Sequence, residues 1–223
     1  VDNFWINKPA ETHYVCPNVS LFRLIGSVIG NFEQKKILEL GFAHGSDLLE
    51  CERRGAQVFG LDLNENYISS VSQFTEAKLQ LFRAGTDTIP FGVHFDLIYS
   101  IDTIYYLTDA ELEHLFRQFC LNLMPQGQII VQFIETDLKC DKNKVSENFD
   151  LDFLNNYKPH RIHAQKNSPI RHLKSNEVAA IAMRCGLQLI GSKRQLSSYN
   201  LNETEIRVEK FLVFAHCSDQ KNT

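Results

Sequence analysis

The sequence predicts an α/β fold: a mainly parallel sheet with helices on both faces, finished by an antiparallel hairpin. Short apolar runs alternate along the chain with segments in which apolar residues recur every three or four positions. Such alternation of strands and helices indicates a parallel sheet that is covered on both faces. The last two apolar runs are joined only by a polar segment, so they pair most economically as antiparallel strands.

Seven apolar runs, each bounded by charged, polar or glycine residues, are the predicted strands. In chain order they read KKILEL, AQVFGLDL, LQLFRAG, FDLIYSI, QIIVQFIE, LQLIGSKR and RVEKFLVFAHC. The first predicted helix covers residues 19–32, and SDLLECERRG forms the second. NENYISSVSQF follows with Asn64 as its cap.

Two further helices belong to the second half of the chain. TDAELEHLFRQFCLNLMPQG begins with a capping box formed by Thr108 and Glu111, and its last three residues, PQG, end it. SNEVAAIAMRCG is a capped helix that stops at Gly186. Each helix therefore lies between two predicted strands, as the alternating pattern requires.

Composition and charge exclude several classes of protein. The chain has 223 residues, 43% hydrophobic and 22% charged, which is ordinary for one soluble domain. A formal net charge of -4 argues against broad nucleic-acid binding, which needs a cationic surface. We find no apolar stretch of membrane-span length and no signal segment. The six cysteines are scattered without zinc spacing, which favours a reducing compartment and predicts a cytoplasmic protein.

We expect a single domain over residues 1–223, with residues 1–32 as an N-terminal helical cap and residues 33–135 as its core. Residues 136–174 are polar and weakly periodic, and residues 175–217 hold the last helix and the hairpin. In open parallel sheets, ligands bind outside the carboxyl ends of the strands. The 136–174 insertion leaves from such an end, so we expect it to form a lid or a substrate wall.

The turn after the first predicted strand has the composition of a ligand cradle. Gly41, Ala43 and Gly45 provide the small residues that let a backbone approach a nucleotide-like ligand. The spacing is E-x-G-x-A-x-G, and Ser46 stands where a dinucleotide fingerprint has its third glycine, which disfavours NAD. A plain strand-to-helix connection remains the alternative interpretation.

Asp62 ends the second predicted strand. A carboxylate in this place can accept hydrogen bonds from both hydroxyls of a ribose. Because Asn64 and Glu65 follow, Asp62 could instead belong to a helix cap. The glycine turn about 20 residues earlier favours the ligand-binding interpretation.

Five segments, taken in order, resemble the class I methyltransferases that depend on S-adenosylmethionine. They are KKILELGFAHGSDLL, VFGLDLNENYI, FRAGTDTIPF, FDLIYSIDTIYYLTD and LMPQGQIIVQF. SNEVAAIAMRCGLQLI and EKFLVFAHC are similar to the end of that family's fold, so the resemblance covers residues 33–135 and 173–217. It implies a Rossmann-like, seven-stranded sheet. It also implies direct displacement of the methyl group of S-adenosylmethionine onto a small-molecule acceptor.

The resemblance also implies which residues bind the methionine part of the cofactor. These residues are Glu39, Gly41, Ala43 and Gly45, with Phe42 and His44 presented by the same loop.

The adenosine part has its own set of implied residues. Asp62 would hold the ribose hydroxyls, and Leu63 would pack on the adenine. The family often has an acidic residue for the adenine amino group where this chain has Gly85. That contact would then come from the backbone of Gly85 and Thr86, or from Asp87. At the end of the fourth strand the implied cofactor-binding residues are Ser100 and Asp102.

Tyr105 and Tyr106 stand where the family often has a histidine pair, just past a strand end. They are candidate catalytic residues, and we expect one of the two to pack into the core instead. His163 in the insertion is the third candidate, as a general base. His160 and His163 have a metal-like spacing, but no third ligand stands at a recognisable distance, so no metal is expected.

Five basic residues and no acidic one lie between Lys158 and Lys174. Such a cluster beside an active site would suit an anionic acceptor, one that carries a carboxylate or a phosphate. The alternative is a solvated loop. The expected partner is a small molecule, and neither nucleic acid nor a membrane.

Two other functions remain open on the sequence. A nicotinamide-dependent oxidoreductase is disfavoured by Ser46 and by the final hairpin. A non-catalytic binding or regulatory protein would keep the fold with a degraded cofactor site. Ala43 and Gly85 point slightly that way, whereas the rest of the loop and Asp62 point more strongly to an intact site.

Overall fold

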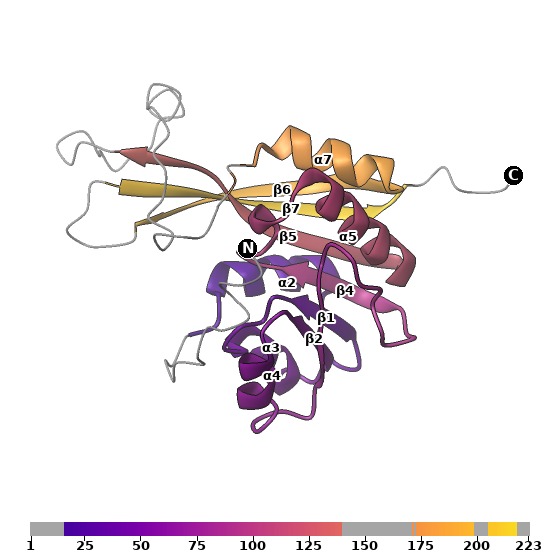
Figure 1. Ribbon diagram of the computed structural model, residues 1–223. Helices are drawn as coiled ribbons and strands as arrows, with labels where there is room; N and C mark the ends of the chain where they lie inside the picture. Colours follow the sequence, from indigo (N-terminus) through magenta and orange to yellow (C-terminus); the bar gives the residue numbers. More distant parts are fainter. Residues whose placement is uncertain (1–15, 140–170, 172, 199–204, 218–223) are drawn as a thin grey trace, which may run out of the picture.

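The computed structural model describes residues 16–139, 171, 173–198 and 205–217. Over these residues the chain forms a seven-stranded sheet with helices on both faces (Figure 1). The strand order is β3-β2-β1-β4-β5-β7-β6. The predicted fold class is confirmed, including the antiparallel pairing of the last two strands.

Each predicted strand and helix has a counterpart among the described residues. The strands are β1 Lys36–Leu40, β2 Gln57–Asp62, β3 Lys78–Leu81, β4 Phe95–Ser100, β5 Leu123–Lys139, β6 Leu187–Ser198 and β7 Glu205–His216. The helices are α2 Val19–Ile29, α3 Ser46–Arg53, α4 Glu65–Val71, α5 Asp109–Asn122 and α7 Ser175–Arg184, with a short 3-10 helix η1 at Ile104–Tyr106.

Two predicted helix starts have the expected geometry. The Asn64 side chain caps α4 and accepts a hydrogen bond from the Asn66 N–H at 2.8 Å. Thr108 and Glu111 form both halves of the capping box of α5. The start of α7 differs, because Lys174 occupies its cap position without a side-chain cap bond.

β1 lies inside the parallel part of the sheet, between β2 and β4. In this register Glu39 of β1 has Gly60 of β2 on one side and Tyr99 of β4 on the other. β7 runs antiparallel to both β5 and β6. The carboxyl ends of β1, β2 and β4 therefore meet at one edge of the sheet, where the predicted cofactor residues lie.

Two apolar clusters fill the spaces between sheet and helices. One packs α5 and α7 on one face and includes Leu38 and Ile98. The other packs α2, α3 and α4 on the opposite face and includes Ile37 and Tyr99. Because successive strand residues alternate between faces, Glu39 also points to the side of α3. Among the described residues, no helix combines the length and apolar character that crossing a membrane requires.

β5 is longer at both ends than the sequence predicts. α5 ends at Asn122 and β5 begins at the next residue, so the PQG predicted to end the helix lies in the strand. Its pairing with β4 shifts register between Phe95 and Leu97. At the other end, β5 continues to Lys139 because β7 pairs with it there. As a result, β5, β6 and β7 project beyond the rest of the sheet (Figure 1).

Candidate functional site

The loop over residues 41–45 joins β1 to α3 and contains three left-handed residues. Gly41, Ala43 and Gly45 have φ angles of 79°, 44° and 75°. A Cβ on Gly41 would overlap the Thr103 hydroxyl, and one on Gly45 would lie 2.7 Å from Val71 Cγ1. Both glycines are therefore required by conformation and by close packing. Ala43 adopts the same conformation with its methyl group, and such strained residues gather at functional sites.

Asp62, the last residue of β2, is 7% exposed and forms hydrogen bonds with the loop after β1 and with the loop after β2. Its Oδ2 accepts the Ala43 N–H at 2.9 Å, and its Oδ1 accepts the Asn64 N–H at 2.9 Å. Burial raises the pKa of this carboxyl above its ordinary value of 3.8, and the backbone hydrogen bonds lower it. A carboxylate can accept about four hydrogen bonds, and the N–H groups of Ala43, Asn64 and Leu63 use three of these sites, so Asp62 retains capacity for a hydroxyl.

Glu39 is 4% exposed, and its carboxylate lies between β4 and α3. The Tyr99 hydroxyl donates to its Oε2 at 2.8 Å, and the Leu48 N–H in the first turn of α3 also donates to it. Burial raises the pKa of Glu39 well above 4.5. The charges of Asp47 and Asp62 raise this pKa further, and the two hydrogen bonds lower it.

Asp47 lies in the first turn of α3 and is the third carboxylate of this region. Its Oδ1 accepts the Asn18 N–H at 2.6 Å, which connects the start of α2 to α3. Burial raises the pKa of Asp47 as well. We call Glu39, Asp47 and Asp62 the buried acidic group. Within the described ranges, no lysine or arginine forms an ion pair with any of its members.

Three other residues expected near the cofactor lie in the loops that follow β1 and β2. Phe42 is 4% exposed and its ring packs in the core of the α3 face, so its side chain does not line the loop. The His44 ring lies edge-on to Tyr67 of α4, with 5.1 Å between the ring centroids. Leu63 is half-buried directly after Asp62. The loop therefore offers backbone groups and His44, rather than the Phe42 ring, to a ligand.

The turn after β3 contains the residues expected at the adenine. The Asp87 carboxylate accepts the Arg83 N–H at 2.8 Å and the Thr86 hydroxyl at 3.1 Å. The Thr86 N–H also bonds within the turn, to the Arg83 carbonyl at 3.1 Å, so both predicted alternatives for the adenine contact take part in closing this turn. A Cβ on Gly85 would overlap the Glu111 side chain of α5, so packing against α5 explains a glycine here.

The end of β4 carries another left-handed residue. Asp102 has a φ of 51°, and its N–H donates to Oε1 of Gln132 on β5 at 2.9 Å. Ser100 is buried and its hydroxyl donates to the Leu40 carbonyl at 3.2 Å. Ser100 and Asp102 therefore lie beside the end of β1, at the same edge of the sheet as the buried acidic group.

The two tyrosines of η1 have different surroundings. Tyr105 is 5% exposed and belongs to the α5–α7 cluster, which confirms that one of the pair packs into the core. Tyr106 is half-buried, with its ring centroid 4.6 Å from that of Tyr105. His160 and His163 lie outside the described residues. The part of the chain that is described holds no group of three His, Cys, Asp or Glu arranged for a metal.

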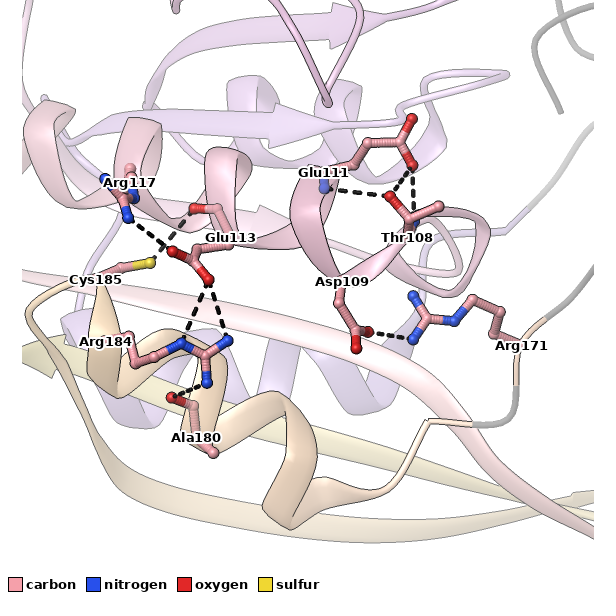
Figure 2. A network of polar contacts seen from close by, with 9 residues as sticks. All are labelled: Thr108, Asp109, Glu111, Glu113, Arg117, Arg171, Ala180, Arg184 and Cys185. Atoms are coloured by element: carbon pink, nitrogen blue, oxygen red, sulfur yellow. Dashed lines mark hydrogen bonds and ion pairs between the residues drawn. The ribbon is translucent and has the colours of Figure 1, made fainter.

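Two members of the predicted basic cluster are described, and both have acidic partners. The Arg171 guanidinium pairs with Asp109 at the start of α5 (Figure 2). It also donates to the Leu107 carbonyl. Lys174 lies 3.6 Å from the Glu177 carboxylate. Arg171 also donates its backbone N–H to the Tyr105 carbonyl at 3.0 Å. Through these contacts Arg171 is held against η1 and the start of α5. The other three basic residues lie outside the described ranges.

The sequence does not reveal Tyr99, Gln132 and Thr103 as parts of this site. Tyr99 lies in an apolar run and reads as core, and Gln132 is one polar residue in a buried strand. Their contacts depend on the pairing of β4 with β1 and β5. The available signal was a polar side chain inside an otherwise apolar strand, as at Tyr99 and Gln132. Because buried polar groups need hydrogen-bond partners, such a residue indicates a contact with another segment.

Comparison with known proteins identifies what the chain is similar to. Residues 37–127 match the family model described as a methyltransferase domain. A phosphoethanolamine N-methyltransferase of Triticum aestivum is 30% identical over 121 residues, which are 52% of this chain and 23% of that protein. The chain therefore corresponds to only a part of that relative's length.

Solved structures share the fold. A TehB-like SAM-dependent methyltransferase from Corynebacterium glutamicum aligns with a TM-score of 0.59 at 19% identity, over 87% of this chain and 86% of its own. An S-adenosylmethionine-dependent methyltransferase from Mesorhizobium loti aligns with a TM-score of 0.62 at 16% identity, over 87% and 98%. The strand order with its antiparallel β7 is typical of the class I methyltransferase fold, and residues 37–127 are similar to the methyltransferase domain family.

Proposed function

We propose that the chain binds S-adenosylmethionine at the 41–45 loop and transfers its methyl group to a small-molecule acceptor. S-adenosylmethionine is the methyl donor of the family. The observation that carries the proposal for this chain is the buried acidic group beside that loop. The charges of Asp47 and Asp62 lie close enough to Glu39 to raise its pKa beyond the effect of burial, and no basic side chain among the described residues forms an ion pair with any of the three carboxylates.

The charge of the ligand decides between the two cofactors that this fold accommodates. S-adenosylmethionine carries a sulfonium and an ammonium against a single carboxylate, so it is a net cation. NAD carries a pyrophosphate, which the uncompensated charges of Glu39, Asp47 and Asp62 would repel. Burial strengthens both effects because the surroundings screen charge weakly. The acidic group therefore supports S-adenosylmethionine and adds to the argument from Ser46 against NAD.

Each part of the site has a distinct task in this proposal. The bound cofactor supplies an activated methyl group, because its sulfonium is a good leaving group. Asp62 binds the ribose hydroxyls with the acceptor capacity that the N–H groups of Ala43, Asn64 and Leu63 leave free. The strained backbone at Asp102, held by Gln132, fixes the end of β4 beside the loop. Alignment is then the main catalytic contribution, worth about 7–11 kcal/mol when it is complete.

The two departures from the family pattern do not indicate a degraded site. Ala43 adopts the left-handed conformation of the loop, and its N–H is bound by Asp62. Gly85 is accounted for by its packing against Glu111. Both substitutions have a structural explanation that leaves the cofactor site intact, which favours an enzyme over a non-catalytic binding protein.

A small acceptor is supported by two observations. The wheat relative is a phosphoethanolamine N-methyltransferase, which by its name acts on a small molecule. Tyr106 is half-buried next to the end of β4, where it would form a wall of the acceptor site. The described basic residues give no support to an anionic acceptor, since Arg171 and Lys174 already have acidic partners. Tyr106 is the candidate to orient the acceptor, with His163 as the candidate base.

The test is the affinity of Asp62→Ala for S-adenosylmethionine, measured by calorimetry. Hydrogen bonds to a charged group are each worth about 1.5–3 kcal/mol, so the affinity should fall at least about tenfold. Glu113→Gln on the outer face of α5 is the matched control and should bind as the unaltered chain does. Circular dichroism establishes that both variants are folded. Unchanged affinity of a folded Asp62→Ala chain would contradict the ribose assignment.

A further inference from the structure

Tyr99 is a fully buried polar residue for which the family resemblance gives no role. It lies in β4 with 0% exposure, and its hydroxyl donates to Glu39 Oε2 at 2.8 Å. On its other side the hydroxyl is 3.6 Å from Cys51 Sγ of α3. A phenylalanine would fill the same space without a buried hydroxyl. The tyrosine is therefore explained by its hydrogen bond to Glu39 rather than by packing.

The sheet register makes Tyr99 the sole lateral donor to Glu39 from a neighbouring strand. Glu39 has Tyr99 as its direct partner on β4 and Gly60 on β2. The space beside Gly60 is already filled, because a Cβ there would lie 2.6 Å from Leu79 Cδ2 and 2.8 Å from both Leu48 Cδ1 and Phe42 Cδ1. The position beside Glu39 on β2 thus carries no side chain that could donate. Of the two strands that flank β1 in the described sheet, β4 is the one whose side chain joins the carboxylate to the sheet.

The other contacts of Glu39 come from α3 and from β2. The cap residue of α3, Gly45, has no side-chain cap bond, and the Leu48 N–H donates to Glu39 instead. The charged or titratable groups that act on Glu39 are Asp47 of α3 and Asp62 of β2, both anionic, and the Tyr99 hydroxyl. The Cys51 thiol contacts Tyr99, and Arg54 at the end of α3 acts on Cys51.

We propose that Tyr99 is a positioning residue: its hydroxyl holds the Glu39 carboxylate in place as the anionic partner of the cofactor's ammonium end. This inference rests on the proposed function, since it requires that S-adenosylmethionine binds beside Glu39. Tyr99 itself does not contact the reacting atoms. It acts through Glu39, where it provides one of the two hydrogen bonds that offset the burial and the like charges around this carboxylate.

The sign of the pH dependence follows from these contacts. Burial raises the pKa of Glu39 in the free protein, so rising pH converts the neutral acid into the carboxylate that attracts a cation. Affinity for S-adenosylmethionine should therefore increase with pH until Glu39 is ionised. The Tyr99 hydrogen bond lowers the pKa of Glu39, so Tyr99→Phe should move this increase to higher pH.

The experiment is calorimetric titration of S-adenosylmethionine into the full chain over a series of pH values. Tyr99→Phe should bind about tenfold more weakly near neutral pH and should recover its affinity as pH rises. Cys51→Ala is the matched control, because Cys51 contacts the same hydroxyl from the opposite side and leaves the bond to Glu39 in place. Its pH profile should match that of the unaltered chain.

A second variant, Glu39→Gln, tests the same role by removing the ionisable group and leaving Tyr99 unaltered. Its affinity should be low and should lose the pH-dependent increase, and adding Tyr99→Phe to it should have no further effect. A uniform loss of affinity at every pH for Tyr99→Phe, or full additivity with Glu39→Gln, would overturn the role of Tyr99. Complete absence of binding by the unaltered chain would overturn the proposed function and this inference together.

Discussion

In two regions of this chain, carboxylates have opposite surroundings and opposite pKa shifts. On the outer face formed by α5 and α7, Glu113 contacts both Arg117 and Arg184, at 2.7 Å and 3.1 Å (Figure 2). These partners lower the pKa of Glu113, with Arg117 as the larger cause. In the buried acidic group the pKa of each carboxyl is raised, and backbone N–H groups and one tyrosine take the place of cations.

The contrast separates a structural charge from a functional one. An exposed carboxylate with arginine partners is satisfied within the protein, and it contributes little to stability because solvent screens it. Buried carboxylates without a cation are costly, since burial and mutual repulsion both oppose ionisation. Three of them lie at the ends of β1 and β2 and the start of α3, which supports our proposal that a cationic ligand binds there.

The largest expected effect comes from breaking the loop to which Asp62 is anchored. Gly41→Ala should destabilise the chain by about 1–2 kcal/mol for the left-handed backbone and by about 1–3 kcal/mol more for the overlap with Thr103. Gly92→Ala is the control, because Gly92 has a positive φ of 62° and nothing within 4 Å of an added Cβ.

Chemical denaturation measures both free energies of unfolding. The Gly41→Ala chain should lose clearly more stability than the Gly92→Ala chain, and Thr103→Ala should recover part of the difference. Equal losses for the two glycine variants would contradict the close approach of Gly41 to Thr103.

A smaller effect sharpens the comparison between the two regions. Asp47→Asn keeps the oxygen that accepts the Asn18 N–H and removes one negative charge next to Glu39. The free protein should therefore keep or gain thermal stability, while its affinity for S-adenosylmethionine should fall about threefold. Glu113→Gln should do the reverse, with unchanged affinity and no gain in thermal stability. Differential scanning fluorimetry and calorimetry check both. A marked loss of stability in Asp47→Asn would contradict the view that its charge serves a ligand.

The sequence predicts the fold well because local signals determine it. The spacing of apolar residues and the position of turn residues locate the strands and helices. Side-chain caps such as Asn64 and Thr108 form where they are predicted. The start of α7 is different because the Ser175 hydroxyl donates to Glu135 of β5 at 2.7 Å, a contact between distant segments. The length of β5 likewise depends on β7, which lies far along the chain.

The candidate site is predictable where its residues stand at a recognisable spacing along the chain. Gly41, Ala43 and Asp62 are found from spacing, and the structure joins them through a hydrogen bond between Ala43 and Asp62. The inward direction of the Phe42 ring depends on packing that spacing does not reveal. The bond between Tyr99 and Glu39 requires the register of two strands that lie about 60 residues apart in the chain.

The most direct test of the acidic site is parallel calorimetric titration of the unaltered chain with S-adenosylmethionine and with NAD. A site with three uncompensated carboxylates should bind the cationic S-adenosylmethionine, and NAD should give no heat of binding at concentrations that saturate the first ligand. Binding of NAD with equal or higher affinity would contradict the account, because an anionic pyrophosphate would then be accepted beside Glu39, Asp47 and Asp62.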